Sequence, residues 1–385
     1  MGDLLSIGEF ARQIDDRDID IVAQPIVDLV RGTVVGYEAL ARFPTTNGLG
    51  VEGWFELADR SGLGHRLEAA ALANALDLRG DLPPNCFLTV NVGPTALTTR
   101  AVRDVLAQAG SLAGVVVELT EHRQVEDLPT VLAVLDELRR AGAMVAIDDA
   151  GAGYAGLRHI LDIRPDLLKI DRSLISELDT DETKRALVSM LGVFADRADA
   201  WLLAEGIETP GELAAAVDLG VPLGQGWALA RPAPPWATLD DAVADTIRTG
   251  LERSRQGNDR MTAATVMEVA RWADADTYVP ATTSADPRPL VLLDPRRRPV
   301  AVLATPSAAP SHLGITRAHP DTELTNLARR MLARPHQLRH TPVAIVDGAG
   351  RYLGIVRWER TIEALIERAD TPAVPGCSRA PTVPA

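Results

Sequence analysis

Polar residues stand at the ends of five short apolar stretches, each at the point where a β-strand should stop. In chain order these residues are Glu38, Asn91, Glu118, Asp148 and Lys169. A charged side chain at the exit of an apolar strand is unfavourable unless several exits converge on a group that needs charge. Oxygen ligands gathered in this way suit Mg²⁺ or Mn²⁺, the ions of phosphate-ester chemistry. The sequence therefore predicts a metal site.

The elements that must position these residues follow a repeating pattern. From about Asp18 to Ala230, apolar runs alternate with segments of helical periodicity, which is typical of βα units. The expected strands are Ile21–Val27, Val34–Arg42, Phe87–Asn91, Val115–Thr120, Met144–Asp148, Leu167–Ile170, Trp201–Ala204 and Gly224–Ala228. The expected helices include Arg66–Leu78, Leu128–Ala141, Thr183–Ala195, Gly211–Leu219 and Leu239–Glu252.

The connection between the first two expected strands is short, because it spans only residues 29–33. A connection of this length joins antiparallel strands, so one of the two should run against the rest. A parallel barrel gathers its strand ends on one rim, and that rim carries the chemistry. The predicted fold class is therefore α/β: a modified TIM (β/α)8 barrel with an antiparallel opening strand, plus a smaller α+β domain.

Length and composition limit the possible classes of protein. A chain of 385 residues suits a barrel of about 250 residues with a smaller partner domain. The net charge of −14 argues against a nucleic-acid polymer as partner. Two cysteines offer neither a disulfide framework nor a zinc cluster. We see no signal peptide and no run of about 18 apolar residues, so we expect a cytoplasmic protein without membrane insertion.

Changes in composition along the chain predict the domain boundaries. We expect a barrel domain over residues 1–250, a linker over 251–260, a second domain over 261–370 and a disordered tail over 371–385. The second domain contains two strand–turn–strand segments. They are Leu290–Leu293 with Val300–Leu303, and Val343–Val346 with Tyr352–Val356.

Residues from about Ile315 to Glu367 resemble a cystathionine-β-synthase-type (CBS) module, on the strength of the run from Thr341 to Val356 and the helix after it. Nucleotide-binding copies of that module carry a Thr or Ser and an Asp where this chain has Arg357 and Arg360. The resemblance therefore favours a dimerisation or packing module over an adenine-nucleotide sensor. An unidentified ligand or protein partner at this domain stays open.

The barrel region, over roughly residues 15–235, resembles the EAL-family phosphodiesterases, which hydrolyse cyclic di-GMP to linear pGpG on a TIM barrel. Six motifs carry the resemblance, and they occur in order along the chain. They are Glu38-Ala39-Leu40-Ala41-Arg42, Glu118-Leu119-Thr120-Glu121, Asp148-Asp149-Ala150-Gly151-Ala152-Gly153-Tyr154, Asp166-Leu167-Leu168-Lys169-Ile170-Asp171, Ala204-Glu205-Gly206-Ile207-Glu208-Thr209 and Gly224-Gln225-Gly226.

This resemblance implies a role for each matching residue and two Mg²⁺ or Mn²⁺ ions in each active site. The ligands of the first cation would be Glu38, Asn91, Glu118 and Asp148, with Asp149 holding the second. The catalytic residues would be Glu38, Lys169, which would orient the attacking water, and Glu205, which would contact metal-bound water or act as a base. Substrate would be positioned by Gln24, Arg42 and Gln225. Support for the loop from Asp149 to Gly156 would come from Glu121 and Glu208. Relatives also imply a homodimer.

Each motif alone has a plainer interpretation; Asp148-Asp149, for example, could be a helix cap or a turn. The loop after Asp149 also departs from the family pattern, because Ala150 replaces a usual Phe and Ala152 a common Thr. Two alternatives to the enzyme therefore stay open. One is a catalytically weak or inactive domain that serves as a cyclic di-GMP receptor or protein-interaction module. The other is hydrolysis of a different phosphodiester.

Overall fold

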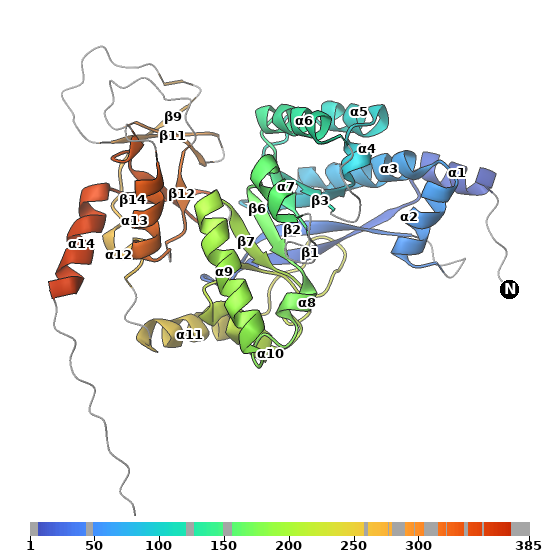
Figure 1. Cartoon of the computed structure of the whole chain (residues 1–385). Coiled ribbons are helices and arrows are strands. Elements are labelled where there is room, and N and C mark those ends of the chain that lie inside the picture. The colour runs from blue at the N-terminus through green and yellow to red at the C-terminus, as the bar shows by residue number, and fades with distance from the viewer. Residues whose placement is uncertain are drawn as a thin grey trace, which may run out of the picture. The chain divides into compact units, whose positions relative to one another are not determined.

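The computed structural model of the chain describes residues 7–43, 49–120, 127–148, 156–257, 261–275, 277–278, 289–295, 297–303, 315–320, 322–334, 338–348 and 350–370 (Figure 1). The chain divides into two compact units. The first comprises Met1–Arg260 with Asp347–Arg351, and the second Met261–Val346 with Tyr352–Ala385. Among the described residues, no helix is both long and apolar enough to cross a lipid bilayer.

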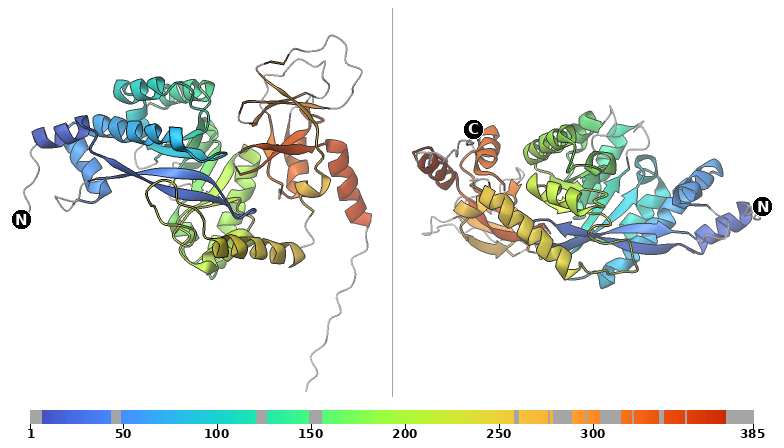
Figure 2. Two further views of the ribbon diagram at one scale, coloured as in Figure 1. Left: turned by 180° about the vertical axis from the view of Figure 1, so that it is seen from behind. Right: turned by 90° about the horizontal axis from the view of Figure 1, so that it is seen from below.

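The first unit is built on a closed barrel whose strands follow one another in chain order. These strands are β1 (Asp20–Asp28), β2 (Thr33–Arg42), β3 (Phe87–Val92), β4 (Val115–Leu119), β5 (Met144–Ile147), β6 (Leu167–Ile170), β7 (Trp201–Ala204) and β8 (Leu223–Gly224). Strand β1 pairs antiparallel with β2 and β8, whereas the pairs from β2 to β8 are parallel. The expected barrel with an antiparallel opening strand is confirmed, and β1 and β2 run side by side in each view (Figure 2).

Helices cover the outer face of the barrel, which explains why its strands are almost uniformly apolar. In β4, for example, all five residues are buried, as expected for a strand covered on both faces. The helices of this unit are α1 (Ile7–Asp15), α2 (Val51–Arg60), α3 (Gly64–Asp77), α4 (Pro94–Leu97), α5 (Arg100–Gln108), α6 (Leu128–Arg140), α7 (Gly156–Ile163), α8 (Arg172–Ile175), α9 (Glu182–Ala198), α10 (Pro210–Asp218) and α11 (Asp241–Gly257).

An apolar layer fills the interior of the barrel below the polar residues. Its members are Ile26, Val35, Phe87, Val116, Ala146, Leu167, Leu203 and Leu223. Phe87 fits because Gly36 on the neighbouring strand has no side chain; a Cβ there would lie 2.4 Å from the Phe87 ring. Side chains two residues apart on a strand share a face. Glu118 comes two residues after Val116, and Lys169 two residues after Leu167. Both side chains therefore point into the barrel above this layer.

Two expectations about element ends differ from the structure. The last strand was expected over Gly224–Ala228, but β8 ends at Gly224, and residues 226–229 form a turn. The backbone of Gly226 has φ of +153°, and a Cβ there would lie 2.2 Å from the Ile207 carbonyl oxygen, so the chain turns where it packs against the loop after β7. Helix α11 extends through Gly257, so residues 251–257, where a linker was expected, are helical.

The second unit contains two three-stranded sheets, with strand orders β11-β10-β9 and β12-β13-β14. The strands are β9 (Arg271–Asp274), β10 (Leu290–Leu293), β11 (Pro299–Leu303), β12 (Arg317–Ala318), β13 (Val343–Val346) and β14 (Tyr352–Val356), and the helices are α12 (Ala263–Val266), α13 (Leu324–Ala333) and α14 (Trp358–Asp370). Both expected strand–turn–strand segments form antiparallel pairs. The relation of this unit to CBS modules stays a prediction.

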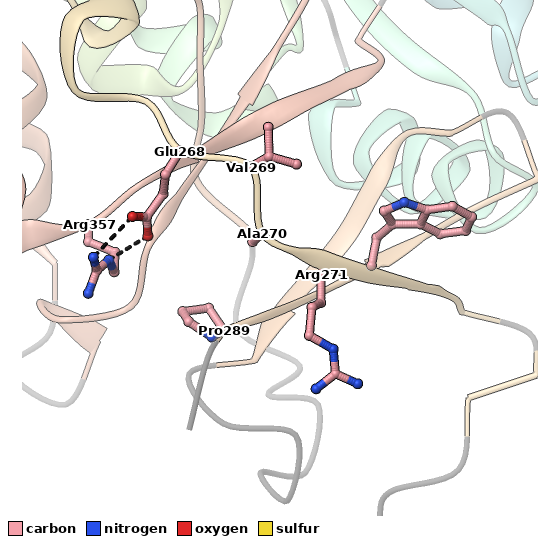
Figure 3. Close-up of a pocket in the computed structure, with 7 residues that line it drawn as sticks. Glu268, Val269, Ala270, Arg271, Pro289 and Arg357 are labelled. Atoms are coloured by element: carbon pink, nitrogen blue, oxygen red, sulfur yellow. Dashed lines mark hydrogen bonds and ion pairs between the residues drawn. The ribbon is translucent and has the colours of Figure 1, made fainter. Parts of the chain in front are cut away.

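A hollow of about 680 Å³ lies in the second unit, beside strand β9 (Figure 3). An ion pair joins Glu268 to Arg357 at its edge, with Arg357 Nη2 donating to Glu268 Oε2 over 3.0 Å. Arg271 and Pro289 also line it. None of the polar residues that follow the barrel strands contributes to this hollow.

Candidate metal centre

The side chain of Lys169, at the end of β6, is enclosed by four carboxylates. Its Nζ donates to Glu118 Oε1, lies 2.5 Å from Glu205 Oε1, and is 3.5 Å from Glu38 Oε1 and 3.6 Å from Asp148 Oδ1. Four of these residues lie in the last two positions of a strand or just after one, whereas Glu38 lies inside β2, one residue before the pairing of β2 with β3 ends. The barrel thus brings these four acids and the lysine together at one rim.

A second set of contacts holds Glu38 on the other side of this cluster. Asn91 Nδ2 donates to Glu38 Oε1 over 3.0 Å, and Gln225 Nε2 donates to Glu38 Oε2 over 2.6 Å. Gln225 Nε2 also donates to Gln24 Oε1 over 3.0 Å, and Gln24 Nε2 donates to the Ala230 carbonyl over 3.0 Å. The predicted residues Gln24 and Gln225 therefore belong to the same connected network as Glu38.

Burial and charge shift the titration of these groups in different directions. Burial raises the pKa of Glu118 well above its ordinary value; Lys169 opposes this shift, while Glu38 and Asp148 add to it. Burial also acts on Glu38, but Lys169 and the amide donors outweigh it and lower the pKa of Glu38. Burial acts to lower the pKa of Lys169, and the surrounding carboxylates outweigh it and raise that pKa. One ammonium cannot balance four carboxylates, so the cluster attracts further positive charge.

The donor set fits a divalent cation. Carboxylate oxygens of Glu118, Asp148 and Glu205 lie within 4.8 Å of one another. Glu118 Oε2 is buried and has no hydrogen-bond partner among the residues that the structure describes. A buried carboxylate oxygen without a partner is unfavourable, and coordination of a hard cation would relieve it. Asn91 adds an amide oxygen beside Glu38, since its nitrogen makes the contact described above.

Four predicted residues lie outside this network or outside the described residues. Arg42 donates to its neighbour, the Ala41 carbonyl, over 2.8 Å. Glu208 pairs with Arg172, which follows β6, and not with the acidic cluster. Asp149 and Glu121 lie outside the described residues, so the predicted second-cation ligand and the predicted support of its loop stay predictions.

Thr89 is a polar residue of the barrel interior that the sequence patterns did not reveal. It lies between Phe87 and Asn91 on β3, is fully buried, and its hydroxyl has no partner among the described residues. Its partner in the barrel register is Glu38 on β2. Its position in the sequence could have indicated this, because Thr89 stands two residues before Asn91 and therefore on the same face of the strand.

Comparison with known proteins decides the family. Residues 7–232 match the EAL domain family, and this segment is more than half of the chain. This chain belongs to the EAL domain family. The matching segment contains every strand of the barrel and every described residue of the acidic cluster.

Relatives of this EAL domain include proteins named for an activity. The chain is 31% identical over 231 residues to "Probable cyclic di-GMP phosphodiesterase PdeB" of Escherichia coli (strain K12), a match that covers 57% of this chain and 44% of that protein. It is 30% identical over 239 residues to "Cyclic di-GMP phosphodiesterase NbdA" of Pseudomonas aeruginosa, covering 59% and 30%. The chain thus spans less than half the length of these curated relatives.

Solved structures resemble the same segment. The calcium/cy-diGMP complex of Klebsiella pneumoniae BlrP1 at pH 8.0 superposes with a TM-score of 0.51 at 30% identity, covering 57% of each chain. The PaMucR phosphodiesterase, in complex with c-di-GMP, gives a TM-score of 0.53 at 27% identity and covers 60% of this chain and 98% of its own. A manganese/cy-diGMP complex of BlrP1 at pH 9.0 is also similar, with a TM-score of 0.50 at 32% identity.

Proposed function

We propose that this EAL domain hydrolyses cyclic di-GMP to linear pGpG with the help of two divalent cations, Mg²⁺ or Mn²⁺. The observation that carries the proposal is the convergence of Glu38, Glu118, Asp148 and Glu205 around Lys169 at one rim of the barrel. The named relatives and the ligands of the similar structures support cyclic di-GMP as the substrate.

The acids and the amide would hold the cations. Glu38, Asn91, Glu118 and Asp148 would bind the first, and Asp149 would bind the second. Bound divalent cations would lower the pKa of the attacking water towards about 7 and offset charge on the phosphoryl oxygens. The strand pairing of the barrel fixes the first four of these residues before substrate arrives, and such preorganisation lowers the barrier to reaction.

Lys169 and Glu205 would act on the attacking water. Lys169 is 1% exposed and enclosed by carboxylates, so it keeps its proton and serves as a fixed positive charge and donor rather than as a base. Glu205 lies against Lys169 and retains some exposure, with 20% of its side chain accessible. It is therefore the better placed of the two to accept a proton from water near the rim.

Gln24 and Gln225 would position the substrate indirectly and Arg42 directly. Gln225 donates to one oxygen of Glu38 and to Gln24, while the other Glu38 oxygen accepts from Asn91, so the amides hold this carboxylate in place for a cation. Arg42 ends β2 on the same rim, four residues after Glu38, where its guanidinium would reach a phosphate of the dinucleotide.

The altered loop after Asp149 favours one second candidate, a cyclic di-GMP receptor with weak or absent turnover. Ala150 and Ala152 replace larger residues of the family pattern next to the expected ligand of the second cation. Weak placement of Asp149 would reduce turnover and leave binding by the first site intact.

A hydrolysis assay separates the candidates. The purified chain of 385 residues is incubated with cyclic di-GMP and Mg²⁺ or Mn²⁺, and the nucleotides are resolved by chromatography. We expect linear pGpG with wild-type protein and none with Glu38→Ala. Glu56→Ala is the matched control, because Glu56 is an exposed glutamate of α2 that pairs only with Arg60 among the described residues. Tight binding of cyclic di-GMP without product would favour the receptor. Hydrolysis of cyclic di-AMP in place of cyclic di-GMP would show that the substrate is a different phosphodiester.

A further inference from the structure

An exposed tryptophan stands beside the metal centre and takes no part in the contacts described so far. Trp227 follows Gln225 by two residues, and 51% of it is exposed. Two residues of chain span at most about 7 Å, so Trp227 lies near the network that holds Glu38. A single exposed tryptophan is common on protein surfaces. The turn that carries this one, however, is held by hydrogen bonds to other parts of the barrel rim.

The turn after β8 is attached to two other parts of the barrel rim. The Ala228 N–H donates to the Ile207 carbonyl over 2.9 Å, and the Ile207 N–H donates to the Gln225 carbonyl over 3.1 Å. Gly226 makes this close approach possible, because any side chain there would clash with the Ile207 backbone. The Ala230 carbonyl accepts from Gln24. Trp227 is therefore fixed relative to the glutamine pair and Glu38.

Arg231 holds the indole itself. The Arg231 guanidinium carbon lies 4.0 Å from the centroid of the Trp227 ring, in the geometry of a cation–π contact. This contact covers one face of the indole and restricts its rotation. The ring area that stays exposed belongs to a side chain that is already ordered, so stacking of a planar ligand on it costs little side-chain conformational entropy.

We propose that Trp227 is the stacking surface for a guanine base of the substrate, with Arg231 as the residue that positions it. The inference rests on the proposed function, since it assumes that a dinucleotide occupies the rim. A cyclic dinucleotide presents planar bases beside its phosphates, and bases stack readily on aromatic side chains. The acidic cluster would hold cations, and through them phosphate, but its carboxylates offer no surface for a base. Trp227 supplies that surface next to it.

The test compares two tryptophans in the same kind of setting. Trp272 in the second unit is 45% exposed and lies under Arg297 at 4.1 Å, so Trp272→Ala is a matched control. Trp227→Ala, Trp227→Phe and Arg231→Ala are assayed with it in the full chain. The readouts are KM and kcat for cyclic di-GMP, the Kd for cyclic di-GMP with Ca²⁺, the ion of the BlrP1 complex, and the quenching of tryptophan fluorescence on binding.

We expect Trp227→Ala to raise both KM and Kd about 10-fold or more with kcat nearly unchanged. Trp227→Phe should keep most of the affinity and lose most of the quenching, and Arg231→Ala should weaken binding about 2- to 5-fold. Trp272→Ala should match wild type. If Trp227→Ala binds cyclic di-GMP like Trp272→Ala, this inference is overturned, and the proposed function still stands where wild type hydrolyses the dinucleotide. If wild type neither binds nor hydrolyses it, both are overturned. A change in oligomeric state at unchanged Kd would also overturn the inference, in favour of a protein contact.

Discussion

Two buried glutamates of the first unit, Glu118 and Glu212, have nearly the same exposure, 0% and 6%. At Glu212, both oxygens accept from backbone N–H groups: those of Glu208 at 2.8 Å and Thr209 at 3.0 Å on one oxygen, and that of Glu177 at 3.2 Å on the other. At Glu118, one oxygen meets only Lys169 and the other has no partner among the described residues.

The difference supports our proposal that Glu118 binds a metal ion, whereas Glu212 stabilises the fold. Glu212 completes a capping box with Thr209 at the start of α10, so its carboxylate stabilises the folded chain. The negative charge of Glu118 inside the barrel is only partly neutralised, and the raised pKa of its carboxyl reflects its burial. A buried acid that the fold does not satisfy indicates that a ligand completes it.

The largest expected effect is on activity at Glu118. Replacement by Gln keeps the shape and one oxygen but removes the charge that we propose binds a metal ion, so we expect hydrolysis to fall about 1000-fold or more, the equivalent of several kcal/mol. In metal-free buffer the same variant should unfold at a higher temperature than wild type, because the charged form of Glu118 is unfavourable in the folded protein. Each kcal/mol corresponds to about 2–4 °C.

Calorimetry with and without Mn²⁺ measures both parts of this prediction. Added Mn²⁺ should stabilise wild type more than Glu118→Gln, which loses at least the tighter ion, since only protein that binds the ion is stabilised. A variant that is less stable than wild type without metal, and that still responds to Mn²⁺, would assign Glu118 to the fold.

The pH dependence of metal binding gives the next largest effect. A proton and a cation compete for Glu118, and its pKa is raised above the ordinary 4.5, so affinity for Mn²⁺ should fall on acidification at a pH well above 4.5. The fall should approach about 10-fold per pH unit for one competing proton. Isothermal titrations between pH 8 and pH 5 measure it, and a constant Kd over that range would contradict the raised pKa.

The stability difference between wild type and Glu118→Gln should follow the same titration. A carboxyl with a raised folded pKa stabilises the folded protein below its unfolded pKa, and this contribution is lost as the pH rises through the folded value. The advantage of the variant in metal-free buffer should therefore be largest near pH 8 and shrink as the pH falls. A difference that grows on acidification would contradict this sign.

At Glu212 we expect the opposite pattern, a loss of stability with little change in catalysis. Glutamine would turn an amide NH2 towards a backbone N–H that now has an acceptor, which costs about 1–3 kcal/mol. Activity per folded molecule should stay within about 2-fold of wild type. Denaturant unfolding and the hydrolysis assay measure these values. A Glu212→Gln protein that is stable but inactive would contradict the assignment of Glu212 to stability alone.

The smallest expected effect is at Thr209, the other half of the capping box. Thr209→Ala removes the acceptor for the Glu212 N–H, now 3.1 Å away, and should destabilise the protein by about 1 kcal/mol. Metal binding should not change. Denaturant unfolding monitored by circular dichroism measures the loss, and an effect on Mn²⁺ affinity would show that α10 and the metal centre are coupled.

Much of the barrel could be predicted from the sequence because its strands are short apolar runs between amphipathic helices. Strands β4 and β6 begin and end within one residue of their expected bounds. The end of β8 could not be predicted, because Trp227 and Ala228 continue the apolar run in the sequence. The backbone of Ile207, which lies close only in the fold, forces the turn at Gly226.

The convergence of the site also followed from topology, since parallel strands bring Glu118, Asp148 and Lys169 to one rim. The ion pairs within the rim did not follow from topology. Lys169 lies closer to Glu205 than to Asp148, and Glu208 pairs with Arg172. These contacts depend on side-chain positions that long-range packing sets. Sequence spacing carries no information on such distances.

A titration of metal-free protein with Mn²⁺, counted by electron paramagnetic resonance, tests the metal centre most directly. Wild type and Glu212→Gln should each bind about two ions per chain, and Glu118→Gln should lose at least the tighter one. If wild type binds no Mn²⁺, or if Glu118→Gln binds it as tightly as wild type, the acidic cluster around Lys169 is not a metal site.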